Sequence, residues 1–586
     1  MNHIVLSWIL RILGPARLTG PIFDKELRVS SRRRRNYVLR FVYVGLFTFL
    51  LAMIWQGTVS QGTSALYQSA RMAEAGMAIM TVVVWFQFIA TQAIAIVMLS
   101  TSISDEIYHR TLGVLMTTPI GSFQIVLGKL LSKLLQLVLL LGITLPLLAI
   151  VRVFGGVPWG YLVSALCVTL TTVIFVGALS LFFSIFTRRA YVVIIATVLV
   201  LGLLFALFPL IAAFVVHYLV DELSQDTFFG TLSYVNPYVI MTVGTATLFS
   251  ATPPFTTHWP IHCGIMLGAS ALLVLAAVIL VRRAALRQAM GQTGLWSGRS
   301  AEESHENPSE CSVRRVRGSP LLWKERRAPL LGRRKAMAIV GIAATLVLLF
   351  LTYALCAGED LLDDNGTHAT YIVIFVGLGM LFTVVLPATC ITSEKESMTW
   401  PLLLTTTVGD WQIIYGKFLG VLRRCLPVWL LLFGHLVIFT LAGEIHPVAL
   451  MQMGILVAWT VIFLTSTGLY FSTRFKHTTT AVIANMALAA GLWAIFPILL
   501  GIVLVMTRGD GDFLSLYMDT NPFVHAAVIA TATAHHEGLN DYEWMQGGLS
   551  GVADATGWIV LNFIIYVTVG LVFVGRAGSR LRRNPF

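Results

Sequence analysis

Long apolar runs separated by short polar segments dominate this chain, and they fall into two series of six. The first series predicts membrane spans at about 37–55, 77–101, 130–154, 160–186, 191–220 and 261–281. The second series predicts spans at about 336–356, 371–391, 418–442, 448–471, 479–506 and 558–574. Most of these runs reach the roughly 20 residues that an α-helix needs to cross a bilayer. The pattern therefore predicts an all-α polytopic membrane protein with twelve transmembrane helices.

One polar stretch occurs twice and relates the two series. Residues 103–131 and 391–419 lie 288 positions apart and share the motif I-[ST]-x-E, T-x-x-x-L-x-T-T, G-x-x-Q-I and G-K. Both copies follow the second span of a six-span series. Since six spans return the chain to the side where it started, the pattern predicts two parallel six-helix repeats.

The segments that precede each series also correspond. Residues 20–26 read GPIFDKE and residues 319–325 read SPLLWKE, and an arginine-rich cluster follows each. We expect an interfacial helix at the N-terminal end of each half. The polar residues between the series have no apolar period, which is typical of a flexible linker. These patterns predict three parts: a first six-span half at 1–287, a cytoplasmic linker at 288–318, and a second six-span half at 319–586.

Composition and charge agree with this class. Apolar residues make up 57% of the chain and charged residues only 12%, about half the charged fraction of a soluble domain. In the predicted topology 37 of the 40 lysines and arginines fall on one side, the exceptions being Arg71, Arg152 and Arg508. This bias predicts that both termini are cytoplasmic. It explains the net charge of +12 without nucleic acid.

The sequence lacks several chemical signatures. There is no G-x-x-x-x-G-K-[ST] phosphate loop, so ATP is not bound by that route. The predicted span interiors hold no Asp, Glu or Lys, which argues against a proton-coupled carrier. The six cysteines form no C-x-x-C pair, and we expect no metal site. If the protein pumps a substrate, the energy must come from a partner, and the chain itself is not expected to be an enzyme.

The repeated stretch suggests where such a partner would act. It predicts a short helix at about 110–116 in the first copy and 398–404 in the second, each followed by a turn. Ser122 and Asp410 are predicted N-caps of the next helix. A short helix held between two spans could pass a push from a cytoplasmic protein to both of them. The alternative is an ordinary tight loop that recurs only because the gene was duplicated.

The repeated motif, the six-span unit and the Asn-Pro pairs at 236–237 and 521–522 resemble the ABC-2 type family of ABC-transporter permeases. The resemblance implies a type V exporter-like fold, in which this loop carries a coupling helix that docks on an ATPase. In the first copy the implied contact residues are Glu106, Arg110, Thr111, Leu115, Thr117 and Thr118. In the second copy they are Glu394, Thr399, Leu403, Thr405 and Thr406.

The resemblance also implies partners and a location. Two separate ABC ATPase subunits would carry ATP and Mg²⁺, and this chain would need no cofactor of its own. The protein would lie in the cell membrane (inner or plasma membrane) among its lipids and act as an exporter. Its apolar interior favours a lipid-like or amphiphilic substrate. Pro119 and Arg110 are replaced by Thr407 and Met398 in the second copy, so the two docking sites are not expected to be equivalent.

Two other functions fit the same layout. A secondary carrier of the twelve-span facilitator type shares the six-plus-six arrangement, but it predicts intramembrane charges that are missing here. A non-transporting membrane scaffold for a cytoplasmic ATPase would bind the ATPase without substrate-stimulated turnover.

Overall fold

The computed structural model describes most of the chain, and nearly all of the described part is helical. It describes residues 20–31, 65–108, 111–153, 157–187, 190–209, 225–249, 258–289, 319–327, 335–358, 365–507, 512–533 and 551–582, with isolated positions between 37 and 52 and at 212 and 362. Ten helices in this part are long and apolar enough to cross a membrane. They coincide with all the predicted spans except the first and the seventh.

Only scattered positions of the first predicted span, at 37–55, are described, and the linker at 288–318 lies almost entirely outside the described residues. The seventh corresponds to helix α16 (Lys335–Gly358). The chain divides into two compact units, residues 1–310 and 311–586.

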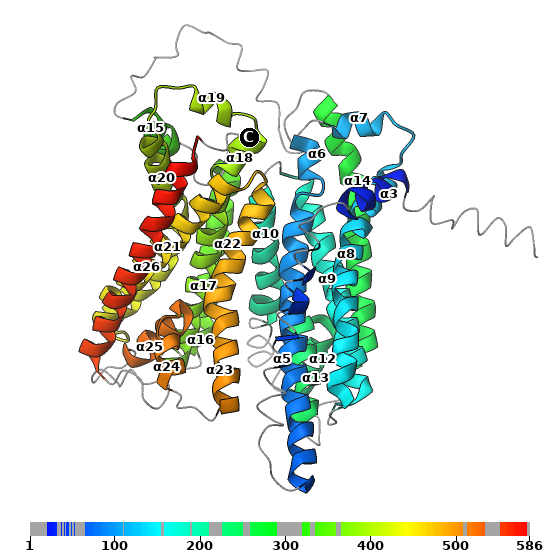
Figure 1. Ribbon diagram of the computed structural model, residues 1–586, viewed down its shortest axis with the longest axis vertical. Coiled ribbons are helices and arrows are strands. Elements are labelled where there is room, and N and C mark those ends of the chain that lie inside the picture. The colour runs from blue at the N-terminus through cyan, green and yellow to red at the C-terminus, as the bar shows by residue number, and fades with distance from the viewer. Residues whose placement is uncertain are drawn as a thin grey trace, which may run out of the picture. The chain divides into compact units, whose positions relative to one another are not determined.

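In the first unit the central helix is α9 (Trp159–Ser184), which is apolar on every side and therefore buried. It packs against α5 (Ala65–Ser100) and α14 (Trp259–Ala289). Helix α8 (Ser122–Val153) packs on α5, and the short helix α3 (Gly20–Ser31) lies against α8. Figure 1 shows these helices side by side in blue, cyan and green.

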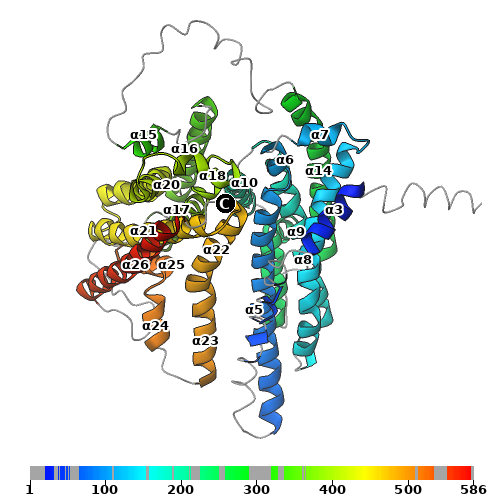
Figure 2. The same cartoon turned by 45° about the horizontal axis from the view of Figure 1, so that its top comes forward.

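In the second unit α21 (Val448–Arg474) takes the central place and packs against α17 (Asn365–Thr389) and α26 (Val552–Arg580). Helix α20 (Asp410–Ala442) packs on α17. The short helix α15 (Pro320–Arg327) lies against α20, as Figure 2 shows. The pairs formed by α3 with α8, and by α15 with α20, thus recur in the two units.

Three helices begin earlier than the apolar pattern predicts. Helices α8 and α20 start at Ser122 and Asp410, eight residues before the predicted spans at 130 and 418. The apolar pattern located only the apolar part of each helix. Each helix in fact begins before a lysine, Lys129 or Lys417, whose charge is paired. Helix α5 starts at Ala65, within the segment 56–74 that was expected to be a polar loop.

The fifth span of each unit contains a π-helical turn with a shared cause. In the second unit this turn is η5 (Gly491–Ile495), between α22 (Thr478–Ala490) and α23 (Phe496–Thr507). Pro497 has no N–H to give to the Trp493 carbonyl four residues earlier. The Asn521 side-chain amide donates to this carbonyl instead, at 2.7 Å.

The first unit repeats this arrangement. Its π turn is η1 (Leu203–Leu207), after α10 (Ala190–Gly202), and Pro209 leaves the Phe205 carbonyl without its helical donor. The Asn236 amide donates to that carbonyl at 2.7 Å. Asn236 and Asn521 precede the short helices α13 (Pro237–Phe249) and α25 (Pro522–Thr533) and accept from their first N–H groups. The two Asn-Pro pairs therefore have the same role in both units.

Candidate functional site

Each copy of the repeated stretch folds into two short helices rather than one. The first copy contains α6 (Ser104–Tyr108) and α7 (Leu112–Met116), and the second contains α18 (Thr392–Glu396) and α19 (Trp400–Leu404). A threonine separates the two short helices of each copy. Its N–H donates to the carbonyl of a glutamate five residues earlier, at 3.0 Å. These residues are Thr111 and Thr399, which bond to Glu106 and Glu394.

The repeated glutamate and the repeated lysine bind each other in both copies. The Lys129 amine lies 3.0 Å from a Glu106 carboxylate oxygen, and the Lys417 amine lies 2.6 Å from Glu394. Lys129 also donates to the Ser102 carbonyl at 2.7 Å. Both lysines are buried. The pair therefore ties the short helices to the following transmembrane helix. A docking partner would find these glutamates already engaged within the fold.

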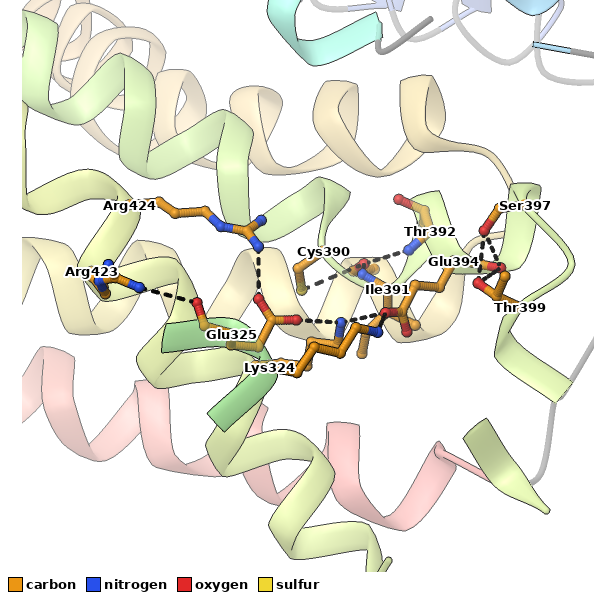
Figure 3. Close-up of polar contacts among 12 residues, drawn as sticks. Lys324, Glu325, Cys390, Ile391, Thr392, Glu394, Ser397, Thr399, Arg423 and Arg424 are labelled. Carbon is orange, nitrogen blue, oxygen red and sulfur yellow. Dashed lines mark hydrogen bonds and ion pairs between the residues drawn. The ribbon is translucent and has the colours of Figure 1, made fainter. Parts of the chain in front are cut away.

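In the second copy this pair belongs to a larger network, drawn in Figure 3. Lys417 also contacts Glu325 of α15 at 2.8 Å, and Arg424 contacts the other oxygen of Glu325 at 2.7 Å. Burial raises the pKa of Glu325, but the charges of Lys417 and Arg424 outweigh this effect and hold the pKa below its ordinary value. The network therefore joins α15, α18 and α20.

A glycine allows this close approach. A Cβ atom on Gly420 would lie 2.9 Å from the Glu325 Cβ, so a larger residue would push α15 away from α20. Arg423 donates to the Glu325 carbonyl at 3.3 Å. The arginine pair at 423–424 thus binds α15.

Two ion pairs are described at the corresponding places of the first copy. Glu26 of α3, which corresponds to Glu325, lies 3.7 Å from Lys133, while Lys129 holds Glu106. Residue 420 has Ser132 as its counterpart at the same offset of 288. The two copies thus share the glutamate–lysine pair but differ in what surrounds it.

The other predicted contact residues have mixed positions. The hydroxyl groups of Thr117, Thr118, Thr405 and Thr406 donate to carbonyls one turn earlier, on an exposed surface. Leu115 and Leu403 are half-buried. The Thr111 hydroxyl binds the Glu106 carboxylate, whereas the Thr399 hydroxyl binds Ser397 at 2.8 Å. Arg110 lies outside the described residues.

Apolar side chains that the sequence analysis did not select form the exposed face of these loops. Val114 of α7 is 66% exposed, and Leu402 of α19 is 68% exposed. Met398 is 70% exposed and has a φ of +55°, a left-handed conformation that is uncommon for residues other than glycine. An apolar residue within a polar loop was the signal that could have found them. The loops therefore expose apolar side chains beside their threonines, while the repeated glutamates are paired within the fold.

The predicted N-cap at Asp410 is wrong. Helix α20 has Gly409 at its N-cap position with no side-chain cap, and the Asp410 carboxylate accepts from Arg582 at 2.6 Å instead. In the first copy the helix already includes Ser122, and the Gly121 N–H donates to the Gln124 side chain at 3.3 Å. Through the contact of Arg582 with Asp410, the residues that follow α26 are tied to the second copy of the loop.

Comparison with known proteins gives one match. A family model described as "ABC-2 family transporter protein" matches residues 21–361 and again residues 360–575. The first of these matches contains the first copy of the loop and the second contains the second copy. Among curated proteins, none matches this chain.

Proposed function

The chain belongs to the ABC-2 family of transporter proteins, whose multi-pass permeases normally work with separate ABC ATPases, and we propose that it supplies the whole membrane part of one transporter. Residues 1–287 and 319–586 would be the two six-span halves, joined by the cytoplasmic linker 288–318. Because the family model matches the chain twice, one chain would replace the usual pair of permease subunits.

We propose that one ATPase subunit docks on each copy of the repeated loop. The support is the exposed apolar surface around Val114 and around Leu402 and Met398. Isolated apolar residues are common on protein surfaces, but here they recur on the short helix of both copies. The glutamate–lysine pair ties each loop to the transmembrane helix that follows it. This pair would make the loop rigid enough to transmit a movement of the ATPase to that helix.

The sequence motif placed the docking contacts partly on Glu106 and Glu394. Their ion pairs with Lys129 and Lys417 support a different assignment, in which they seat the loop and the apolar residues make the contact. The exposed threonines, Thr117, Thr118, Thr405 and Thr406, remain within the proposed contact surface.

We propose that the substrate is lipid-like or amphiphilic and that it is exported across the cell membrane, with both chain termini in the cytoplasm. The support is the apolar character of the ten spans, whose mean hydropathy is between 1.9 and 2.8. The paired lysines lie within the first turns of α8 and α20, beside the docking loops.

Co-purification tests this proposal. The tagged protein is purified from its native cells, and the amount of phosphate-loop ATPase retained with it is measured by mass spectrometry. We expect Val114→Glu with Leu402→Glu to release the ATPase. Thr531→Glu, at an exposed position on α25, should retain it. Undiminished binding of the ATPase by the folded double variant, or transport that continues after ATP depletion, would overturn the proposal.

A further inference from the structure

Two adjacent charged side chains of α18 each reach the end of a different transmembrane helix. The Lys395 amine donates to the carbonyls of Ser472, Thr473 and Phe475, at 3.2, 2.5 and 3.1 Å. These carbonyls lie at the C-terminal end of α21. The last carbonyls of a helix lack intrahelical donors and carry partial negative charge, which a cation satisfies.

Glu396 binds the first residue of α22, the helix that follows α21. Its carboxylate accepts from the Thr478 N–H at 2.7 Å and from the Thr478 hydroxyl at 2.6 Å. Thr478 is the first residue of α22, and the N-cap residue His477 makes no side-chain cap. The N-terminal end of α22 is therefore capped by a carboxylate from a distant part of the chain, with the sign of charge that this helix end favours.

A third side chain connects the same segments from the opposite direction. The Ser472 hydroxyl accepts from the N–H groups of Ile391 and Thr392, at 2.8 and 2.9 Å. Seven hydrogen bonds thus hold the α18 loop to the junction between α21 and α22. Burial lowers the pKa of Lys395 to about 8, so the amine keeps its three N–H donors at neutral pH.

The first unit has different residues at these positions. At the offset of 288, Lys395 and Glu396 correspond to Ile107 and Tyr108, which offer neither a cation nor a carboxylate. Ser472 corresponds to Ser184, whose hydroxyl donates to Leu181 within its own helix at 2.6 Å. In the second copy the loop is therefore fastened to this junction by charged side chains, which are of a type that the first copy does not have at these two positions.

We propose that Lys395 and Glu396 are positioning residues that pass movement of the second docking loop to α21 and α22. This inference rests on the proposed function, since it takes an ATPase to move the loop. In the second half the fourth and fifth spans would then follow the loop directly, through these seven hydrogen bonds.

The test uses the full chain with its ATPase in lipid nanodiscs and two fluorescent reporters. A fluorescent amino acid replaces either Thr407, an exposed residue of the docking loop outside the proposed contact residues, or Lys476, in the exposed connection between α21 and α22. Each reporter is read with and without ATP on a hydrolysis-deficient ATPase. We expect both reporters to respond in the otherwise unchanged protein.

In Lys395→Met with Glu396→Gln, the reporter at Thr407 should still respond, whereas the response at Lys476 should be lost. Lys395→Arg alone should keep the response at Lys476, because arginine also donates to carbonyls. Ser393→Ala, on the same helix, should leave that response unchanged. Should the double variant not fold, Glu396→Gln alone should weaken the response at Lys476 selectively. Equal responses of both reporters in the variants would overturn the inference. Silence of both reporters in the unchanged protein would instead contradict the proposed function.

Discussion

The substitution Lys417→Met tests whether the buried network contributes more to stability than an ordinary surface ion pair does. Methionine has a similar length but no charge, so Glu325 and Glu394 lose the cation between them. Their side chains are only 6% and 16% exposed, and that of Lys417 is 4% exposed. Water therefore has little access to replace the lost contacts.

The structure gives the size of the effect. Removing one partner of a buried ion pair costs about 3–5 kcal/mol, because a charge is left buried without compensation. Arg424 still holds Glu325 at 2.7 Å, which favours the lower end. Lys324 helps Glu394 little, because its side chain is 64% exposed and such pairs give about 0–1 kcal/mol. We expect Lys417→Met to destabilise the second unit by about 3 kcal/mol.

Lys129→Met is the matched change in the first unit. Lys129 holds one carboxylate, and the Glu106 side chain is 22% exposed, so water can reach it. A hydrogen bond to a charged group contributes about 1.5–3 kcal/mol, and rehydration favours the lower value here. The second unit should therefore lose about twice as much stability as the first.

Unfolding by a denaturing detergent, followed with one fluorescent reporter in each unit, measures both losses separately, because the two units need not unfold in one step. Adding Glu325→Gln and Glu394→Gln to Lys417→Met should recover most of the lost stability, since no buried carboxylate then remains. Equal losses in the two units, or no recovery in the triple variant, would refute the reasoning.

Three further predictions concern single contacts. Asn521→Leu leaves the buried Trp493 carbonyl without a donor and should cost about 1–3 kcal/mol in detergent unfolding; an unchanged midpoint would contradict this. Because the pKa of Glu325 lies below its ordinary value of 4.5, its ion pairs stabilise fully above that pH. The stability difference between wild type and Glu325→Gln should therefore shrink as the pH falls below about 4.5, and a constant difference would contradict the assignment. Gly420→Val should separate α15 from α20 at a cost of about 1–3 kcal/mol, measured in the same assay, whereas Ser132→Val in the first unit should cost less.

Much of the fold follows from the sequence because lipid imposes one strong rule. A span must satisfy its own backbone hydrogen bonds, so long apolar runs form helices. The ten apolar runs that the structure describes as spans were visible for this reason. The starts of α8 and α20 followed from the loop pattern rather than from the apolar runs. Ser122 and Asp410 were predicted as N-caps, within one residue of the observed helix starts, whereas the apolar runs begin only at 130 and 418.

The repeated loop was also predictable, but its internal contacts were only partly so. Glu394 and Lys417 recur in both copies with opposite charges, which is a usable signal for pairing. The role of Glu325 was not visible, because it lies 92 residues from Lys417. Asp410 looked like an N-cap, but it binds Arg582, 172 residues away. Local patterns cannot show a competing partner that only the tertiary fold brings near.

The repeated prolines and Asn-Pro pairs show the same limit. Pro497 and Asn521 were each recognisable as repeated, at slightly different offsets from their counterparts. Their connection through the Trp493 carbonyl appears only when the fifth span is seen beside α25. Repetition marked the residues as important, and the missing N–H of proline gives the reason.

Photo-crosslinking from the docking loops tests the central claim, that separate ATPase subunits drive this chain through both copies of the loop. Benzoylphenylalanine replaces Val114, Leu402 or, as a control of similar exposure on α16, Phe350, which is 74% exposed. Native membranes containing the tagged protein are irradiated, and the crosslinked products are identified by mass spectrometry. We predict that both loop positions capture a phosphate-loop ATPase and that position 350 does not. Capture of no ATPase at either loop position, by protein that is folded and in the membrane, would contradict the account.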